Sequence, residues 1–492
     1  MFAQRPGSTN ETPIVIMAHR DAVGVGAEAE LSGTAALLEL ARVFAARETK
    51  RTIVLISTSG ATAGDAGASE AASGATPLAQ HPGVDAAIVL GDVASSRLER
   101  PAVIPYSDGL GSAPLQLQRT VADAITHEAG TNPGAPSPIG QLAHLIFPLA
   151  PGEQGVLESA GIPAVLVQAS GERGPMTRAR VSAERLEGLG RGVLSAVDAL
   201  DVGTDAATAP EKGLVLQRKV LPGWTVRLLV LALLLAPLAA AADGFARVRR
   251  RREPAGRWLL WSLTCALPFL CCAVFAFLLG RIGVITAPAL PGTRGAMHLG
   301  SSELAAVLAV GLTFGLSWML WARLVRRLGW GVRPDPEVVG VALLVVLAGL
   351  SVVVWIGNPY AALLMLPAVH LWLALADPEL RPRRLGAIAL YLLGLAPLAL
   401  LVVFYAHQFG LGPGAVLWTA VDLVAGGHVG LGSALLWSVA LGSAAAAGML
   451  VFGGPSIPVP AGTGSAREIT IRGPVTYAGP GSLGGTESAL RR

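Results

Sequence analysis

Short apolar stretches alternate with amphipathic stretches over the first 200 residues of the chain. The apolar stretches are rich in β-branched residues, which is typical of strands buried on both faces of a parallel sheet. They lie at residues 13–18, 52–57, 86–90 and 163–168. Helical periodicity is found at residues 32–48, with Ser32 as a candidate N-cap, and further helices are predicted at 115–129 and 182–201. Because strand, helix and strand form a right-handed crossover unit, the pattern predicts an α/β, three-layer sandwich with a mostly parallel sheet.

The second half of the chain is dominated by apolar stretches near the length of about 20 residues that a membrane-spanning helix needs. Seven spans are predicted, at residues 224–244, 257–280, 303–323, 337–356, 359–376, 385–406 and 431–452. A further apolar stretch, at 411–427, is interpreted as re-entrant or interfacial. We therefore expect an α/β sandwich domain (1–212), an all-α multi-pass transmembrane domain (213–452) and a Gly/Pro-rich tail (453–492) that is either disordered or a small hairpin.

Arginines in the loops between the predicted spans indicate their orientation, since short positively charged loops stay in the cytoplasm. The arginine-rich loops hold Arg247, Arg249, Arg250, Arg251, Arg252 and Arg257 after the first span, Arg323, Arg326, Arg327 and Arg333 after the third, and Arg381, Arg383 and Arg384 after the fifth. The alternate loops hold only Arg281 and Arg294. We therefore predict a protein of the bacterial cytoplasmic membrane, with the N-terminal domain extracytoplasmic and the C-terminal tail cytoplasmic.

An extracytoplasmic domain needs a segment that exports it. Residues 1–12 have neither the basic n-region nor the apolar h-region of a secretory signal. We therefore expect the natural polypeptide to have a transmembrane helix upstream of this sequence.

Composition agrees with a membrane protein and narrows its partners. The chain is 52% hydrophobic and only 14% charged, so the lipid bilayer is the first partner predicted. The net charge of +4 comes from arginines grouped between apolar stretches, so nucleic-acid binding is not expected. All three cysteines, Cys265, Cys271 and Cys272, lie in one predicted span and are interpreted as apolar filler.

Ionisable residues in or near the predicted spans are candidates for function, because their burial in lipid is costly. They are Asp243, His370, His407, Asp422 and His428. Asp422 and His428 flank a Gly-Gly pair and form the best intramembrane polar pair. Helix packing at the outer surface is favoured for them over substrate contact or a proton relay.

The candidate chemistry of the N-terminal domain lies at the carboxyl ends of its predicted strands, where ligands bind in open α/β sheets. The first strand ends in AHRD, with His19 and Asp21, and is followed by GAEAELSG and SGTAALLELAR. A basic residue and a second strand come next, and ESAGIPAVLV follows at 158–167. In this order the segments resemble the co-catalytic zinc aminopeptidase family, which includes bacterial leucyl aminopeptidases, over roughly residues 12–200.

The resemblance implies two zinc ions held by a bridging carboxylate and by terminal His and carboxylate ligands, with a Glu as general base. Most of these residues are replaced. Ala29 stands at the position of the bridging Asp, Ala61 and Thr62 at the two Glu positions, Gly91 at the next Asp, and Gly152, Glu153 and Gln154 at the family's Ser-Asp-His. Only His19 remains as a metal ligand, with Asp21 to orient it. No catalytic residue and no cofactor are therefore expected.

A rebuilt metal site is the alternative that the sequence leaves open. Glu28, Glu30, Asp65, Glu70 and Asp92 lie on predicted loops around His19, and His81 is near in sequence. If they converged, zinc would be the cofactor, since zinc sites use at least three protein ligands. The loop at 58–76 is rich in small residues and is predicted to be a flexible rim of the former site.

Three functions fit these patterns. The first is a membrane-anchored, peptidase-like protein that has lost most metal ligands and is a non-catalytic binding or assembly protein for a peptide or another membrane protein. The second is an active metal-dependent aminopeptidase or hydrolase with a rebuilt zinc site. The third is a transporter or lipid-handling membrane protein. Metal content distinguishes the active hydrolase from the non-catalytic binding protein. A polar path for a substrate through the helices would indicate the transporter or lipid-handling protein.

Overall fold

The computed structural model describes residues 1–22, 27–61, 64–73, 83–96, 100–134, 136–173, 180–203, 212–216, 219–285, 301–330, 336–376 and 382–452. Within these ranges the first 203 residues form an α/β domain, and the residues from Gly223 onward are helical. The predicted fold class is therefore confirmed. The predicted domain boundaries stay a prediction, and the tail at 453–492 lies outside the described residues.

A six-stranded sheet forms the centre of the N-terminal domain, with the strand order β1-β3-β2-β4-β6-β5. The strands are β1 (Phe2–Arg5), β2 (Ile14–His19), β3 (Ile53–Thr58), β4 (Ala86–Leu90), β5 (Ala102–Ile104) and β6 (Ala164–Gln168). The strands β3, β2, β4 and β6 are parallel, and β1 and β5 pair antiparallel at the two edges. The four predicted strands are the parallel ones. The edge strands were not predicted because three or four residues carry too little pattern.

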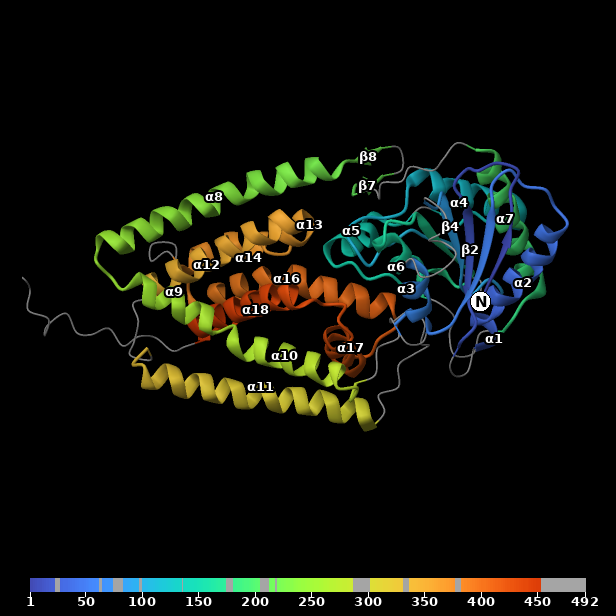
Figure 1. The fold of residues 1–492 in the computed structure, drawn as a ribbon. Coiled ribbons are helices and arrows are strands. Elements are labelled where there is room, and N and C mark those ends of the chain that lie inside the picture. Colours follow the sequence, from blue (N-terminus) through green and yellow to red (C-terminus); the bar gives the residue numbers. More distant parts are fainter. Residues whose placement is uncertain are drawn as a thin grey trace, which may run out of the picture. The chain divides into compact units, whose positions relative to one another are not determined.

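Helices cover both faces of the sheet and give the predicted three layers (Figure 1). On one face α2 (Ser32–Ala45), α4 (Leu115–Ala129) and α7 (Ala183–Val202) pack against alternate strand residues such as Ile16 and Ile88. On the other face α3 (Ala66–Ala72) and α6 (Gln154–Ser159) pack against the intervening residues, such as Met17 and Val89. Both sides of each central strand are therefore buried, which explains why these strands are continuously apolar.

Two local predictions are wrong. Leu31, not Ser32, is the N-cap of α2; the Ser32 hydroxyl donates to the Ala29 carbonyl (2.5 Å) and accepts from the Val93 N–H (2.9 Å). Ser32 therefore ties the start of α2 to the turn after β4. The predicted loop at 58–76 contains the helix α3, because alanine favours helix and Ala68 is buried beside α6.

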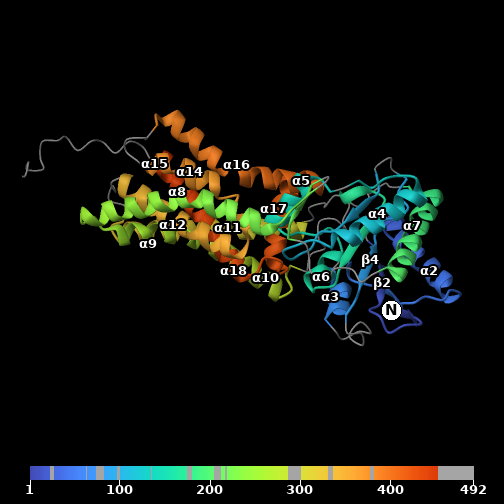
Figure 2. The ribbon, with the colours of Figure 1, turned by 90° about the horizontal axis from the view of Figure 1, so that it is seen from above.

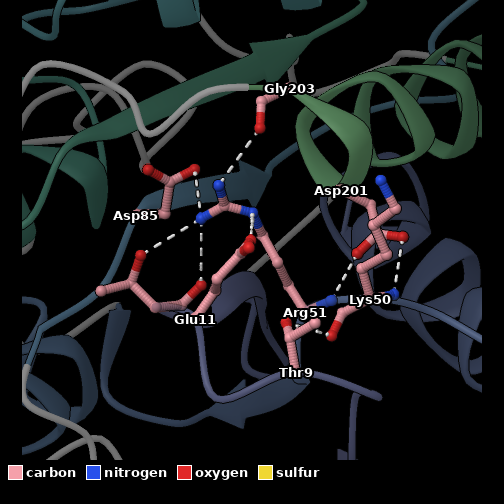
Figure 3. A network of polar contacts seen from close by, with 8 residues as sticks. Thr9, Glu11, Lys50, Arg51, Asp85, Asp201 and Gly203 are labelled. Atoms are coloured by element: carbon pink, nitrogen blue, oxygen red, sulfur yellow. Dashed lines mark hydrogen bonds and ion pairs between the residues drawn. The ribbon is translucent and has the colours of Figure 1, made fainter.

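A buried ion-pair network fixes the start of β3 (Figure 3). The Arg51 guanidinium is 3.3 Å from a Glu11 carboxylate oxygen and 3.5 Å from an Asp85 oxygen, and it donates to the Gly203 carbonyl (3.3 Å). Its backbone N–H donates to Asp201 (2.7 Å). The network connects the N-terminal segment, the approach to β4 and the end of α7.

The described residues contain six helices that are long and apolar enough to cross a membrane. They are α8 (Gly223–Arg250), α9 with α10 (Ala255–Thr264 and Leu267–Arg281), α11 (Ser301–Arg327), α12 (Pro336–Gly357), α16 (Arg384–Gln408) and α18 (Leu431–Phe452). They confirm six of the seven predicted spans and a multi-pass membrane protein. The predicted orientation stays a prediction.

The predicted span at 359–376 is wrong as a continuous helix. It is broken into α13 (Pro359–Ala362), α14 (Leu366–Leu371) and α15 (Leu373–Ala376), with turns between them and a proline near the start of the first two. The three short helices still pack along α12, as Figures 1 and 2 show for α14. The segment at 411–427 forms the 13-residue helix α17 (Pro413–Ala425), too short to cross a bilayer of about 30 Å at 1.5 Å per residue.

Candidate functional site

The carboxyl ends of β2, β3 and β4 lie side by side, because the strand register pairs His19 with Thr58 and Ala18 with Leu90. His19 is the last residue of β2, and Asp21 and Asp92 follow the ends of β2 and β4. The structure therefore brings together the strand ends at which the sequence places the metal site.

His19 and Asp21 are held by the surrounding backbone. The Thr34 hydroxyl donates to the His19 carbonyl, and Asp21 accepts a hydrogen bond from the Ala61 N–H (3.3 Å). Burial lowers the pKa of the half-buried His19 imidazole, against the opposing charge of Asp21. His19 is thus kept in the neutral form that a metal ligand needs, but one ligand is too few for zinc.

The positions that the resemblance assigns to the other metal ligands hold side chains that are poor zinc ligands. Ala29 and Ala61 are 0% and 1% exposed, so buried methyl groups lie at the positions where the resemblance places carboxylates. Gln154 is fully buried, and its side-chain amide has no hydrogen-bond partner among the described residues. An uncharged amide in place of a histidine is a poor zinc ligand. Thr62 lies outside the described residues.

Glu28 and Glu30 are neighbours on the short helix α1 (Ala27–Glu30), but they face different surroundings. Glu28 is exposed, whereas Glu30 is only 8% exposed. Burial, followed by the charges of Asp92 and Asp21, raises the pKa of Glu30 to about 7. Glu30 therefore holds a proton over much of the range in which an exposed glutamate is ionised.

Asp92 has a structural task. One of its carboxylate oxygens accepts hydrogen bonds from the backbone N–H groups of Ala94 (3.0 Å) and Ser95 (2.8 Å). Burial raises the pKa of Asp92, and these two hydrogen bonds oppose that rise. The Asp92 carboxylate therefore closes the turn after β4, and the oxygen that accepts these two hydrogen bonds is occupied by the backbone.

Asp65 and Glu153 form a second acidic group, of which Glu153 was not predicted as a site residue. Asp65 is fully buried, and neither carboxylate oxygen has a hydrogen-bond partner within the described ranges. Burial is the main cause that raises the pKa of Asp65 well above its usual value, and the charges of Glu153, Asp108 and Asp21 act in the same direction. Glu153 accepts a hydrogen bond from the Thr58 hydroxyl (2.5 Å), and burial raises its pKa to about 7. The sequence signal for Glu153 was its alignment with the aspartate of the family's Ser-Asp-His.

The residues present do not fit the two-zinc site of the family. Across the described ranges, no group of three or more His, Cys, Asp or Glu residues is placed to hold a metal ion. Glu70 is exposed on α3, and His81 lies outside the described residues. Burial raises the pKa of Glu30, Asp65 and Glu153, and one oxygen of Asp92 accepts hydrogen bonds from two backbone N–H groups.

A polar contact between the N-terminal domain and the helices was not predicted. The Tyr405 hydroxyl of α16 donates to the Phe147 carbonyl (2.6 Å), next to His144 of α5 (Pro138–Ile146). The His144 ring stacks on Tyr106 with 3.6 Å between ring centroids. The contacts of Tyr405 join residues more than 250 positions apart and leave no local pattern in a sequence.

We expect Tyr405→Phe to weaken this junction by about 1–2 kcal/mol, because the Phe147 carbonyl loses its donor. Hydrogen exchange of α5 in the full chain should become about tenfold faster, the factor that 1.4 kcal/mol represents. Tyr391→Phe is the matched control, since its hydroxyl donates to Ala444 within the membrane helices. Equal exchange of α5 in wild type and Tyr405→Phe would contradict the assignment.

The intramembrane candidates have different surroundings. Asp243 forms an exposed ion pair with Arg247 (3.3 Å), and His370 lies 2.8 Å from the Leu366 carbonyl within its own helix. These two residues therefore have structural partners. Asp422 is buried in α17, His428 lies in the turn before α18, and His407 is in the last turn of α16. The three cysteines form no disulfide, and the Cys265 thiol donates to a carbonyl one helical turn away.

Residues 1–137 match the family model of peptidase family M28. The N-terminal domain is M28-like. The predicted resemblance to zinc aminopeptidases is therefore confirmed, and the M28-like domain is joined to a helical region with candidate membrane spans.

Solved aminopeptidases are similar to the M28-like domain. The aminopeptidase from Aneurinibacillus sp. strain AM-1 is 19% identical with a TM-score of 0.32, covering 42% of this chain and 49% of that chain. The zinc aminopeptidase BSAP from Bacillus subtilis is 17% identical with a TM-score of 0.31, covering 42% and 51%. LapA aminopeptidase from Legionella pneumophila is 16% identical with a TM-score of 0.31, covering 40% and 53%. The chain spans about half the length of these enzymes, and no curated protein matches it.

Proposed function

We propose that the protein is a membrane-anchored M28-like domain that binds a peptide or another membrane protein and does not hydrolyse peptides by a two-zinc mechanism. The observation that carries the proposal is the burial of Ala29 and Ala61 where the family requires carboxylates. A bridging carboxylate and a general base are both needed to hold two metal ions and to take a proton from metal-bound water. Neither group is available at these positions.

The surviving polar residues support a binding role because they maintain the shape of the former site. Asp21 holds the backbone after β3, Asp92 closes the turn after β4, and Glu153 anchors Thr58. The strand ends and their turns are therefore kept although the ligands are lost. In open α/β sheets ligands bind at the carboxyl ends of the strands, so this preserved edge is suited to binding without catalysis.

The contacts with the helices support an extracytoplasmic position of the M28-like domain. Tyr360 donates to the Lys212 carbonyl (2.7 Å), and Gln408 donates to Glu172, so the domain meets the end of α16 and the segment after α12. These are the helix ends next to the arginine-poor loops. The arginine-rich segments follow the opposite ends of α8 and α11, which the positive-inside rule places in the cytoplasm.

Hydrolysis is tested with the full chain purified in detergent, zinc added, and a series of aminoacyl-p-nitroanilides as substrates. We expect the same background rate for wild type and His19→Ala, because no metal-bound water is generated. Zinc-dependent hydrolysis that is lost in His19→Ala would contradict the proposal and establish a rebuilt active site.

The binding role is tested by chemical cross-linking of the full chain in its native membrane, followed by mass spectrometry of the linked peptides. The proposal expects reproducible links between a second polypeptide and the residues after β2, β3 or β4. Links confined to residues of the helices, or to further copies of the chain away from these turns, would contradict it.

A further inference from the structure

A large apolar cavity lies where the M28-like domain meets the membrane helices. Its volume is about 490 Å³, within the range of about 300–1,000 Å³ that ligand pockets occupy. The walls come from α12, α14, α16 and α18, and from residues 108–110 and 146–149 of the M28-like domain. Representative lining residues are Leu347, Met365, Leu398, Trp437 and Leu441.

The polar groups of the cavity are few. Among the described residues that line it, only Asp108 and His428 are ionisable, and no lysine or arginine is present. Asp108 is half-buried, and one carboxylate oxygen accepts a hydrogen bond from the Ala150 N–H (2.9 Å). Burial raises the pKa of Asp108 to about 6, which leaves the carboxylate mostly ionised at neutral pH. The cavity therefore has long apolar walls and a single carboxylate.

The chemistry of the walls selects among occupants. Water is poorly held because an apolar cavity offers it too few hydrogen-bond partners. A peptide is disfavoured because its backbone N–H and C=O groups would lose their hydrogen bonds against leucine and valine. An acyl chain has no such groups, and helices of this length and hydropathy are surrounded by lipid. The negative charge of Asp108 favours an ammonium head group over an anionic one.

We propose that this cavity binds a membrane phospholipid with an ammonium head group, its acyl chain lying between α12, α16 and α18 and its ammonium beside Asp108. This goes beyond the proposed function, since the cavity is lined by none of the residues His19, Asp21 and Asp92. The backbone N–H of Asp108 donates to the Gly155 carbonyl (3.2 Å), close to Glu153. A bound lipid would therefore stand next to the former metal site without depending on it.

The proposal is tested with the full chain in vesicles of equal amounts of phosphatidylethanolamine and phosphatidylglycerol. Trace amounts of each lipid carry a photoactivatable diazirine in the acyl chain, and labelled residues are located by mass spectrometry. We expect labels on cavity residues of α12 and α18, with the ethanolamine lipid favoured about two- to fivefold, as a half-exposed charge pair of about 0.5–1 kcal/mol provides.

Two pairs of variants separate the chain site from the head-group site. Ala440→Trp fills the cavity from α18 and should abolish most labelling of its walls, whereas Leu435→Trp, on an exposed position of the same helix, should not. Asp108→Asn keeps an oxygen for Ala150 and should remove the head-group preference while total labelling persists. Asp123→Asn, an exposed acid on α4, is its control.

Equal labelling of the cavity walls in Ala440→Trp and Leu435→Trp would overturn the proposed lipid site. If Ala440→Trp does not fold, the isosteric Asp108→Asn decides: an unchanged preference for the ethanolamine lipid would overturn the assignment to Asp108. Neither result alters the hydrolysis test on His19, so failure of this proposal is distinguishable from failure of the proposed function.

Discussion

Arg51→Met is expected to destabilise the M28-like domain by about 3–5 kcal/mol, the range for removal of one partner from a buried ion pair. The Arg51 and Asp85 side chains are each 1% exposed, so the substitution leaves a buried carboxylate without its guanidinium. The network also loses the donors to Thr12 and to the Gly203 carbonyl. Because it connects the N-terminal segment to β4 and α7, the loss should affect the whole domain.

The measurement is urea unfolding of the full chain, followed by far-ultraviolet circular dichroism. Arg47→Met is the matched control, since Arg47 pairs with Asp198 at the surface and both are nearly half exposed; we expect a loss below about 1 kcal/mol. The double variant Arg51→Met with Asp85→Leu should recover part of the stability, because it removes both charges. Similar losses for Arg51→Met and Arg47→Met would show that the buried network has no special role.

Glu30→Gln and Glu153→Gln are each expected to stabilise the M28-like domain at pH 8, by about 1–3 kcal/mol at most, and to have little effect at pH 4. Burial raises the folded-state pKa of both carboxyls from 4.5 to about 7. The folded protein therefore binds more protons than the unfolded chain between these values, so wild-type stability falls as pH rises from about 4.5 to about 7. Glutamine is neutral at every pH and removes that fall.

Urea midpoints at pH 4, 6 and 8 test this expectation. Glu28→Gln, two residues from Glu30 but exposed, is the control and should leave the pH dependence unchanged. The sign of the change in stability at pH 8 also distinguishes a domain without metal from one with a rebuilt zinc site. A zinc ion bound among these carboxyls would favour their ionised forms, so glutamine at position 30 or 153 would then destabilise the protein at pH 8.

The core of the fold could be predicted because its elements have strong, local patterns. The strands β2, β3, β4 and β6 are continuous apolar runs, since helices cover both of their faces. The long membrane helices are apolar over more than 20 residues. Few other elements have an apolar run of this length, so these helices could be predicted from hydropathy. The segment from α13 to α15 was predicted as one helix because its hydropathy is continuous, and hydropathy alone does not show where a helix is interrupted.

The candidate site could be predicted only in part. The family motif located His19, Asp21 and the replaced ligands, because they follow strand ends in sequence order. The roles of the remaining carboxyls depend on burial and on neighbours that are distant in sequence, such as Thr58 for Glu153. The cavity beside Asp108 is formed by segments more than 300 residues apart, so no local pattern marks it.

Zinc stoichiometry is the most direct test of the central claim that the M28-like domain has lost its metal site. The full chain and His19→Ala are purified in detergent, incubated with excess zinc, desalted and analysed by inductively coupled plasma mass spectrometry. We predict no zinc above the buffer background in either protein. One or two equivalents of zinc in the wild type, lost in His19→Ala, would contradict the claim.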